Sequence, residues 1–71
     1  MKKISVSLSG HQTSISLEQE FIDALHQIAA HDNISVASII QSIDESRSPE
    51  SNLSSAVRSY ILHRCMQSSK L

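Results

Sequence analysis

The hydrophobic periodicity of this chain changes near Glu18, and this change constrains the fold more than any other feature of the sequence. Before Glu18, aliphatic residues alternate with polar ones in two runs, and Gly10 and His11 separate the two runs. A period of two is typical of strands that bury one face and expose the other. The sequence therefore predicts strands over about residues 3–9 and 12–17.

The two predicted strands are close enough in sequence to form a hairpin. A two-residue loop that begins with glycine suits a type II′ turn, which places Gly10 and His11 at the tip. In this register apolar residues face apolar residues across the ladder: Ile4 opposite Leu17, Val6 opposite Ile15, and Leu8 opposite Thr13. The same alternation also permits the first strand to pair with another chain, so both arrangements remain open.

After Glu18 the apolar residues recur with a period near 3.6, which indicates amphipathic helices. The pattern predicts helices over about residues 18–32, 35–46 and 52–67. Asn33 is expected to adopt the left-handed conformation that ends the first helix, and Ser35 is expected to cap the second. The polar segment 46–51 contains the single proline and is predicted to be a loop, and residues 67–71 are expected to form a frayed tail.

The short chain favours one domain, residues 1–71, that is stabilised by self-association. A domain of this size buries a small share of its surface, and one cysteine cannot form an internal disulfide. Leu62 and Met66 fall off the apolar stripe of the third predicted helix, which favours burial against another subunit. We therefore expect an α+β fold, a β-hairpin or strand pair followed by three helices, in a dimer or higher oligomer such as a tetramer.

Charge and hydropathy exclude several classes of protein. The formal net charge of −1 argues against a strongly basic protein that coats nucleic acid or a membrane surface. No apolar run approaches the roughly 18–20 residues that span a bilayer, and the N-terminus does not resemble a signal peptide. The unpaired Cys65, expected to be a small core residue, agrees with a location in the reducing cytoplasm.

The sequence also offers no arrangement typical of catalysis. The four histidines do not have the spacing of metal ligands, and no glycine-rich phosphate loop or Ser-His-Asp arrangement is present. Arg58 and Arg64 are expected on a solvated face of the third helix, or in ion pairs with acidic residues of the preceding segment (Asp44, Glu45 or Glu50). We therefore expect no enzyme, no cofactor and no bound metal.

Strand, helix, three-residue corner and helix, in this order, resemble the ribbon-helix-helix fold. The segments GHQTSISLE at 10–18, EF at 20–21 and NLSSAVRSY at 52–60 resemble a group of short bacterial ribbon-helix-helix proteins with an extra C-terminal helix. The resemblance implies an intertwined dimer that binds DNA and regulates transcription. That family often has a basic residue at the position of Gln12, which is neutral here.

The candidate DNA-binding residues lie on the polar face of the strands and at one helix terminus. Gln12, Ser14 and Ser16 face outward in the predicted pattern, and Gln and Ser side chains contact base edges in the major groove. Lys2 and Lys3 are both expected to face outward with them and are candidates for phosphate contacts. The amides that follow Ser35 offer a further phosphate site. Each feature also has a plainer explanation, because exposed strands are normally polar and a lysine pair can simply solubilise an N-terminus.

A second function remains open beside DNA binding. If residues 3–17 form a hairpin in each subunit, a dimer sheet has four strands and spans about 14 Å between its outer strands, against a major groove about 12 Å wide. Few cations flank the outer face to contact phosphates. The alternative is a protein-interaction or oligomerisation module, with an unknown protein as partner, that keeps the fold without binding DNA.

Overall fold

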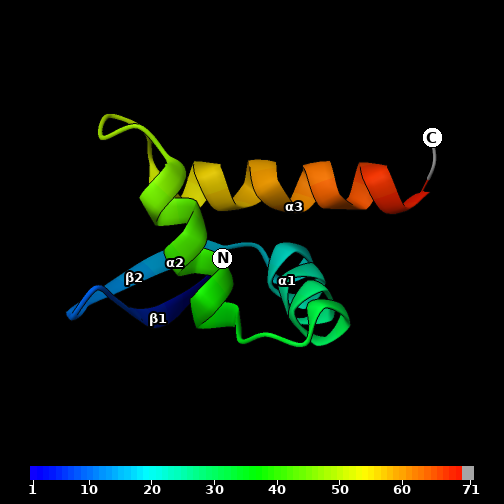
Figure 1. The fold of residues 1–71 in the computed structure, drawn as a ribbon, viewed down its shortest axis with the longest axis horizontal. Coiled ribbons are helices and arrows are strands. Elements are labelled where there is room, and N and C mark those ends of the chain that lie inside the picture. The colour runs from blue at the N-terminus through cyan, green and yellow to red at the C-terminus, as the bar shows by residue number, and fades with distance from the viewer. Residues whose placement is uncertain (70–71) are drawn as a thin grey trace.

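The computed structural model describes residues 1–69 and shows a β-hairpin followed by three helices (Figure 1). The elements are β1 (Lys2–Leu8), β2 (His11–Leu17), α1 (Gln19–Asp32), α2 (Val36–Ser46) and α3 (Leu53–Ser69). This order confirms the expected α+β class with a third C-terminal helix. The helix α3 continues through Ser69, whereas a frayed tail was expected from residue 67, and the end of that tail, 70–71, lies outside the described residues.

The strands β1 and β2 pair with each other, antiparallel, within the one chain. The register places Ile4 opposite Ile15, Val6 opposite Thr13, and Leu8 opposite His11. The loop is therefore Ser9–Gly10, and the prediction of a Gly10–His11 loop is wrong by one position, which moves every cross-strand partner by two residues. Because side chains alternate with a period of two, this shift leaves each residue on its predicted face.

The turn has its observed position because Ser9 is held against α2. Ser9 and Gly10 have φ values of 50° and 82°, so both central residues are left-handed, as a type I′ turn requires. Gln41 in α2 accepts a hydrogen bond from the Ser9 amide at 2.9 Å and donates one to the Ser9 hydroxyl at 2.9 Å. These two bonds stabilise a conformation that a serine rarely adopts.

The hydrophobic core draws side chains from all five elements. The buried residues are Val6, Leu8, Ile15, Leu17, Ile22, Leu25, Ile28, Ala29, Ile39, Ile40, Ile43, Val57 and Ile61. The helix α2 packs against β1, while α3 packs against β2 and against both other helices. In Figure 1, α3 lies across the top of the molecule and joins the hairpin side to the α1 side. The core is therefore closed within one chain by α3.

The corner between α1 and α2 follows the predicted signals. Asn33 adopts the left-handed conformation at φ 59°, and its amide donates to the carbonyls of the last turn of α1. The Ser35 hydroxyl accepts a hydrogen bond from the Ser38 amide at 3.0 Å. Both the left-handed Asn33 and the Ser35 cap are confirmed, which gives the corner a fixed geometry without glycine.

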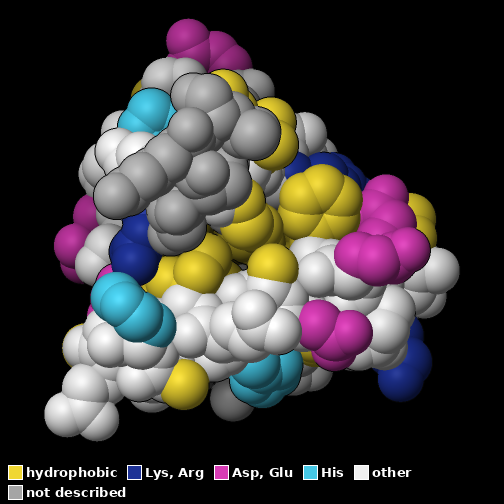
Figure 2. Space-filling view, turned by 90° about the vertical axis from the view of Figure 1, so that its right-hand side faces the viewer, with side chains coloured by type: hydrophobic (Ala, Val, Ile, Leu, Met, Phe, Trp, Pro, Cys, Tyr) yellow, Lys and Arg dark blue, Asp and Glu magenta, His cyan; other side chains and the backbone are white. Residues whose placement is uncertain are grey.

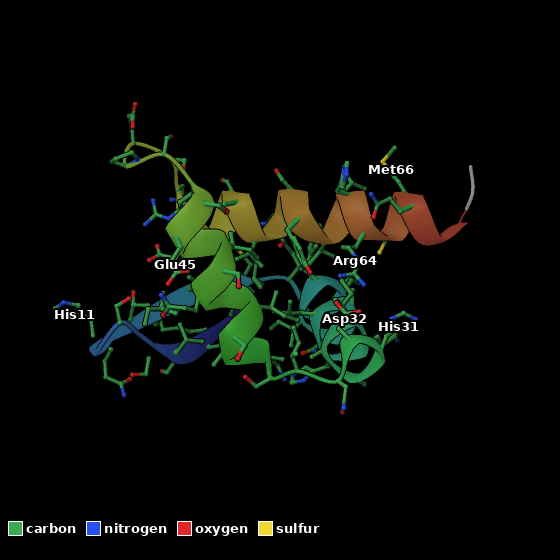
Figure 3. The ribbon with its side chains drawn as sticks, viewed as in Figure 1. His11, His31, Asp32, Glu45, Arg64 and Met66 are labelled. Atoms are coloured by element: carbon green, nitrogen blue, oxygen red, sulfur yellow. The ribbon has the colours of Figure 1, made fainter. Side chains whose placement is uncertain are left out.

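An ion pair fastens the C-terminal half of α3 to the end of α1. The Arg64 guanidinium donates two hydrogen bonds to the Asp32 carboxylate, at 2.7 and 2.9 Å, and a third to the Tyr60 hydroxyl at 2.9 Å (Figure 3). The hydrogen bonds from Arg64, and then the contact with His31, hold the pKa of Asp32 well below its usual range. The expectation that Arg64 pairs with Asp44, Glu45 or Glu50 is wrong.

The end of α3 extends beyond the other elements (Figure 1). Several apolar side chains of α3 are exposed. Leu62 is 58% exposed and Met66 is 54% exposed. Cys65 is exposed as well, so the prediction that it is a core residue is wrong. It lies one turn beyond the buried Ile61, in a part of α3 whose apolar stripe no longer contacts the core. Viewed from this end, hydrophobic side chains gather in the middle of the face, with charged side chains around them (Figure 2).

We expect the Gly10→Ala variant to be less stable than the wild type by about 1 kcal/mol. The cost arises from the positive φ of Gly10, because no atom lies within 4 Å of the position that a Cβ would take and the added methyl group meets no neighbour. Urea unfolding of both proteins measures the difference. Ser7→Ala, an exposed change in the adjacent strand, is the control and should stay within about 0.5 kcal/mol; an equal loss in both variants contradicts the assignment of the turn.

We expect Asp32→Asn to make stability less sensitive to acid. The lowered pKa of Asp32 means that its ionised form stabilises the folded state above the carboxyl pKa of the unfolded chain, about 3.9. This contribution is lost as the pH falls below that value, towards the lower folded-state pKa. Thermal melts between pH 5 and pH 2 should therefore show a smaller fall in Tm for Asp32→Asn than for wild type. Asp23→Asn, a change at an exposed position of α1, is the control and should show the same fall in Tm as the wild type.

Candidate nucleic-acid interface

The outer face of the hairpin is polar along its whole length. Its side chains are Lys3, Ser5 and Ser7 from β1, and Gln12, Ser14 and Ser16 from β2, and all except the half-buried Ser16 are exposed. They form three cross-strand pairs: Lys3 with Ser16, Ser5 with Ser14, and Ser7 with Gln12. The hairpin thus presents one contiguous surface of hydrogen-bonding groups with no carboxylate among them.

The structure brings four of the six predicted site residues together on this face. Gln12, Ser14, Ser16 and Lys3 share it, whereas Lys2 pairs with the buried Leu17 and belongs to the opposite face of the ladder, at its exposed end. The expectation that both lysines face the same way is therefore wrong, because neighbours in a strand point to opposite faces.

Ser35 belongs to the corner between α1 and α2, where it caps α2. Its hydroxyl donates to the Ser38 hydroxyl at 2.9 Å and accepts from the Ser38 amide. The backbone amides of the first turn of α2 follow this cap, and they carry the partial positive charge of the helix N-terminus.

The arginines of this chain are occupied by internal contacts. Arg47 pairs with Asp44 at 2.9 Å, Arg58 with Glu18 at 2.9 Å, and Arg64 with Asp32 at 2.7 Å. Within residues 1–69, Lys2 and Lys3 are the basic residues outside these pairs. An anionic partner of the outer face therefore meets Lys3 there, with Lys2 at the exposed end of the ladder, and no unpaired guanidinium.

The pair formed by Arg58 and Glu18 stands directly beside the outer face. The Arg58 Nε–H donates to Glu18 at 2.9 Å, and its Nη2 donates to the backbone carbonyl of Ser16 at 3.4 Å. A hydrogen bond from its own backbone amide, followed by the one from Arg58, lowers the pKa of Glu18. Sequence reasoning missed this contact, since Arg58 and Glu18 are 40 residues apart and no local pattern joins them.

A cleft of about 340 Å³ lies between the hairpin and the segment that joins α2 to α3. Its walls come from the hairpin (Leu8, Ser9, His11, Thr13, Ser14 and Ile15), from the end of α2 and the following residues (Asp44 and Arg47), and from the start of α3 (Asn52, Leu53 and Ser54). The walls combine aliphatic side chains with hydroxyls, and His11 points away from the helices at the tip of the hairpin (Figure 3). The cleft therefore draws its walls from the hairpin, α2 and α3 together.

Residues 1–69 are also free of two other features that would indicate a function, a metal-binding cluster and a membrane-spanning helix. Across this part of the chain, His, Cys, Asp and Glu side chains do not gather in threes that would hold a metal ion. Its helices also include none with the length and hydropathy that crossing a membrane requires. The outer face of the hairpin remains the surface with the clearest chemical character.

Comparison with known proteins agrees with this geometry. The family model described as ribbon-helix-helix domain matches residues 1–65 of the 71. No match was found among curated proteins or among solved structures. Ribbon-helix-helix domains generally dimerise and bind DNA as regulators rather than act as enzymes. The match covers the hairpin, both helices of the corner and most of α3, and this chain therefore belongs to the ribbon-helix-helix domain family.

Proposed function

We propose that this protein is a transcriptional regulator that binds double-stranded DNA through the outer face of its hairpin. The observation that carries the proposal is the unbroken polar surface of that face, free of carboxylates, in a member of a family that generally binds DNA. The major groove admits a two-stranded ribbon, and Gln and Ser side chains hydrogen-bond to base edges there. The protein would act in the cytoplasm, where Cys65 stays reduced.

The predicted width of a four-stranded sheet does not prevent this binding. Adjacent strands are rotated by roughly 20–25° relative to each other, so the outer strands of a paired dimer turn away from the floor of the groove. The outer face of β1 carries the short side chains Ser5 and Ser7 together with Lys3. These groups suit the sugar–phosphate walls, while the residues of β2 face the bases.

A second candidate function has its own supporting observation. All three arginines are engaged in ion pairs, and phosphate contacts supply much of the affinity of a DNA-binding protein. With so few cations, the same fold serves equally well as a protein-interaction or oligomerisation module. Salt-dependent binding to duplex DNA separates the two functions.

We expect DNA binding to be weak and moderately salt-dependent. A dimer offers at most four lysines, since each chain has Lys3 on the outer face and Lys2 at the exposed end of the ladder. Each neutralised phosphate contributes about 0.9 to the slope of log K against log salt. The slope should therefore not exceed about 4 in magnitude. Gel-shift titrations of random-sequence duplex DNA at 50 and 200 mM salt measure it, and a markedly steeper slope shows that cations outside this face are used.

We expect Gln12→Arg to strengthen binding and to steepen the slope by about 2, since it adds one cation per chain at the outer face. Gln27→Arg is the matched control, because Gln27 is exposed on α1 and adds the same charge away from the hairpin. The control should bind like the wild type. If neither the wild type nor Gln12→Arg binds duplex DNA at low salt, DNA binding is refuted and the interaction module is the better account.

A further inference from the structure

Arg58 is held by fewer hydrogen bonds than the other two arginines. Its guanidinium donates to the Glu18 carboxylate at 2.9 Å and, over a longer distance of 3.4 Å, to the Ser16 carbonyl. Arg64 donates three hydrogen bonds of 2.7–2.9 Å, and Arg47 donates three as well, the shortest at 2.6 Å. Moving the Arg58 guanidinium to a new acceptor therefore breaks the fewest contacts.

Arg58 also stands at the same end of the hairpin as Lys3. This is the open end, opposite the Ser9–Gly10 turn, and Ser16, whose carbonyl Arg58 reaches, is the cross-strand partner of Lys3. Paired residues of an antiparallel ladder lie about 4.5–5.5 Å apart between their Cα atoms. A DNA phosphate that contacts Lys3 at the margin of the outer face is therefore close to the Arg58 guanidinium as well.

Glu18, the residue that follows β2, occupies the Arg58 guanidinium at this end. The side chains of Arg58 and Glu18 are 28% and 45% exposed, so the ion pair is in contact with solvent. Carboxylates and phosphates both accept charge-assisted hydrogen bonds from arginine, and they therefore compete for the same donors. Glu18 belongs to the same chain as Arg58 and is always within reach, which favours it over a phosphate that arrives from solution.

We infer that Glu18 holds Arg58 back from DNA, so that their ion pair is an autoinhibitory contact at the margin of the outer face. The inference rests on the DNA binding proposed above and adds Arg58 as a phosphate contact that becomes available when the Glu18 carboxylate is removed. Phosphate contacts raise the affinity for every sequence alike. By withholding one such contact per chain, Glu18 restricts stable binding to duplexes whose bases also contribute.

The salt dependence of DNA binding by Glu18→Gln tests the inference. This variant keeps the length of the side chain but removes its charge, which frees one guanidinium per chain. For a dimer, we expect the slope of log K against log salt to steepen by about 1.8 relative to the wild type. The gain in affinity over the wild type should therefore be about 12-fold larger at 50 mM than at 200 mM salt. Gel-shift titrations of random-sequence duplex DNA measure both quantities.

Two control variants separate the release of Arg58 from a general change of charge. Asp32→Asn adds the same charge and breaks another ion pair of α3, but it frees Arg64, about 9 Å further along the helix at 1.5 Å per residue (Figure 3). It should keep the wild-type slope. The double variant Glu18→Gln/Arg58→Gln removes both charges of the pair and should also return to the wild-type slope. Thermal melts of all variants verify that each protein is folded at the temperature of the titrations.

The NMR signal of the Arg58 Nε–H group gives a reading that does not depend on affinity. Addition of duplex DNA should leave this signal in place in the wild type and shift it in Glu18→Gln. A wild-type signal that shifts as well, or an unchanged slope for Glu18→Gln, overturns the inference. Equal steepening by Asp32→Asn, or a gain that survives in the double variant, also overturns it and leaves DNA binding intact. If neither the wild type nor Glu18→Gln binds any duplex at low salt, the proposed function itself is refuted.

Discussion

The antiparallel pairing of β1 with β2 is the contact on which the other features of this molecule depend. It directs the aliphatic residues of both strands towards α2 and α3, and in doing so it leaves the opposite face entirely polar. One backbone ladder therefore produces both the core and the candidate DNA-binding surface. It also leaves one edge of β2 outside the two-stranded sheet.

The three arginines form ion pairs within the chain, so few cations remain available to a partner. The pair of Arg58 with Glu18 fastens α3 near the end of β2, and the pair of Arg64 with Asp32 fastens it to the end of α1. Both pairs are partly exposed, where an ion pair adds modest stability but orients the elements that it joins. The outer face consequently carries one cation, Lys3, beside neutral hydrogen-bonding side chains, of which Gln12 is the longest.

The sequence predicted most residues of the candidate site, but it misplaced Lys2 and missed Arg58. Alternation alone placed Gln12, Ser14 and Ser16 on an outward face, and the observed ladder agrees with that placement. The same alternation assigns Lys2 to the other face, which the grouping of two adjacent lysines overlooked. The contact of Arg58 with the edge of β2 had no signal in the sequence, because it joins residues that are 42 positions apart and depends on how α3 crosses the hairpin.

Local periodicity determined the class of the fold, the faces of the hairpin, the left-handed Asn33 and the Ser35 cap, since each of these depends on residues within one turn or one strand. Tertiary structure decided the rest. The turn formed at Ser9–Gly10 rather than at Gly10–His11 because Gln41, 32 residues away from Ser9, holds that serine in a left-handed conformation. Cys65 is exposed because α3 extends beyond the core, although the helical spacing of Cys65 places it on the apolar stripe of α3. Period two and period 3.6 are properties of the chain itself, whereas the register of a hairpin, the length of a buried stripe and the partner of an arginine depend on which distant elements pack against them.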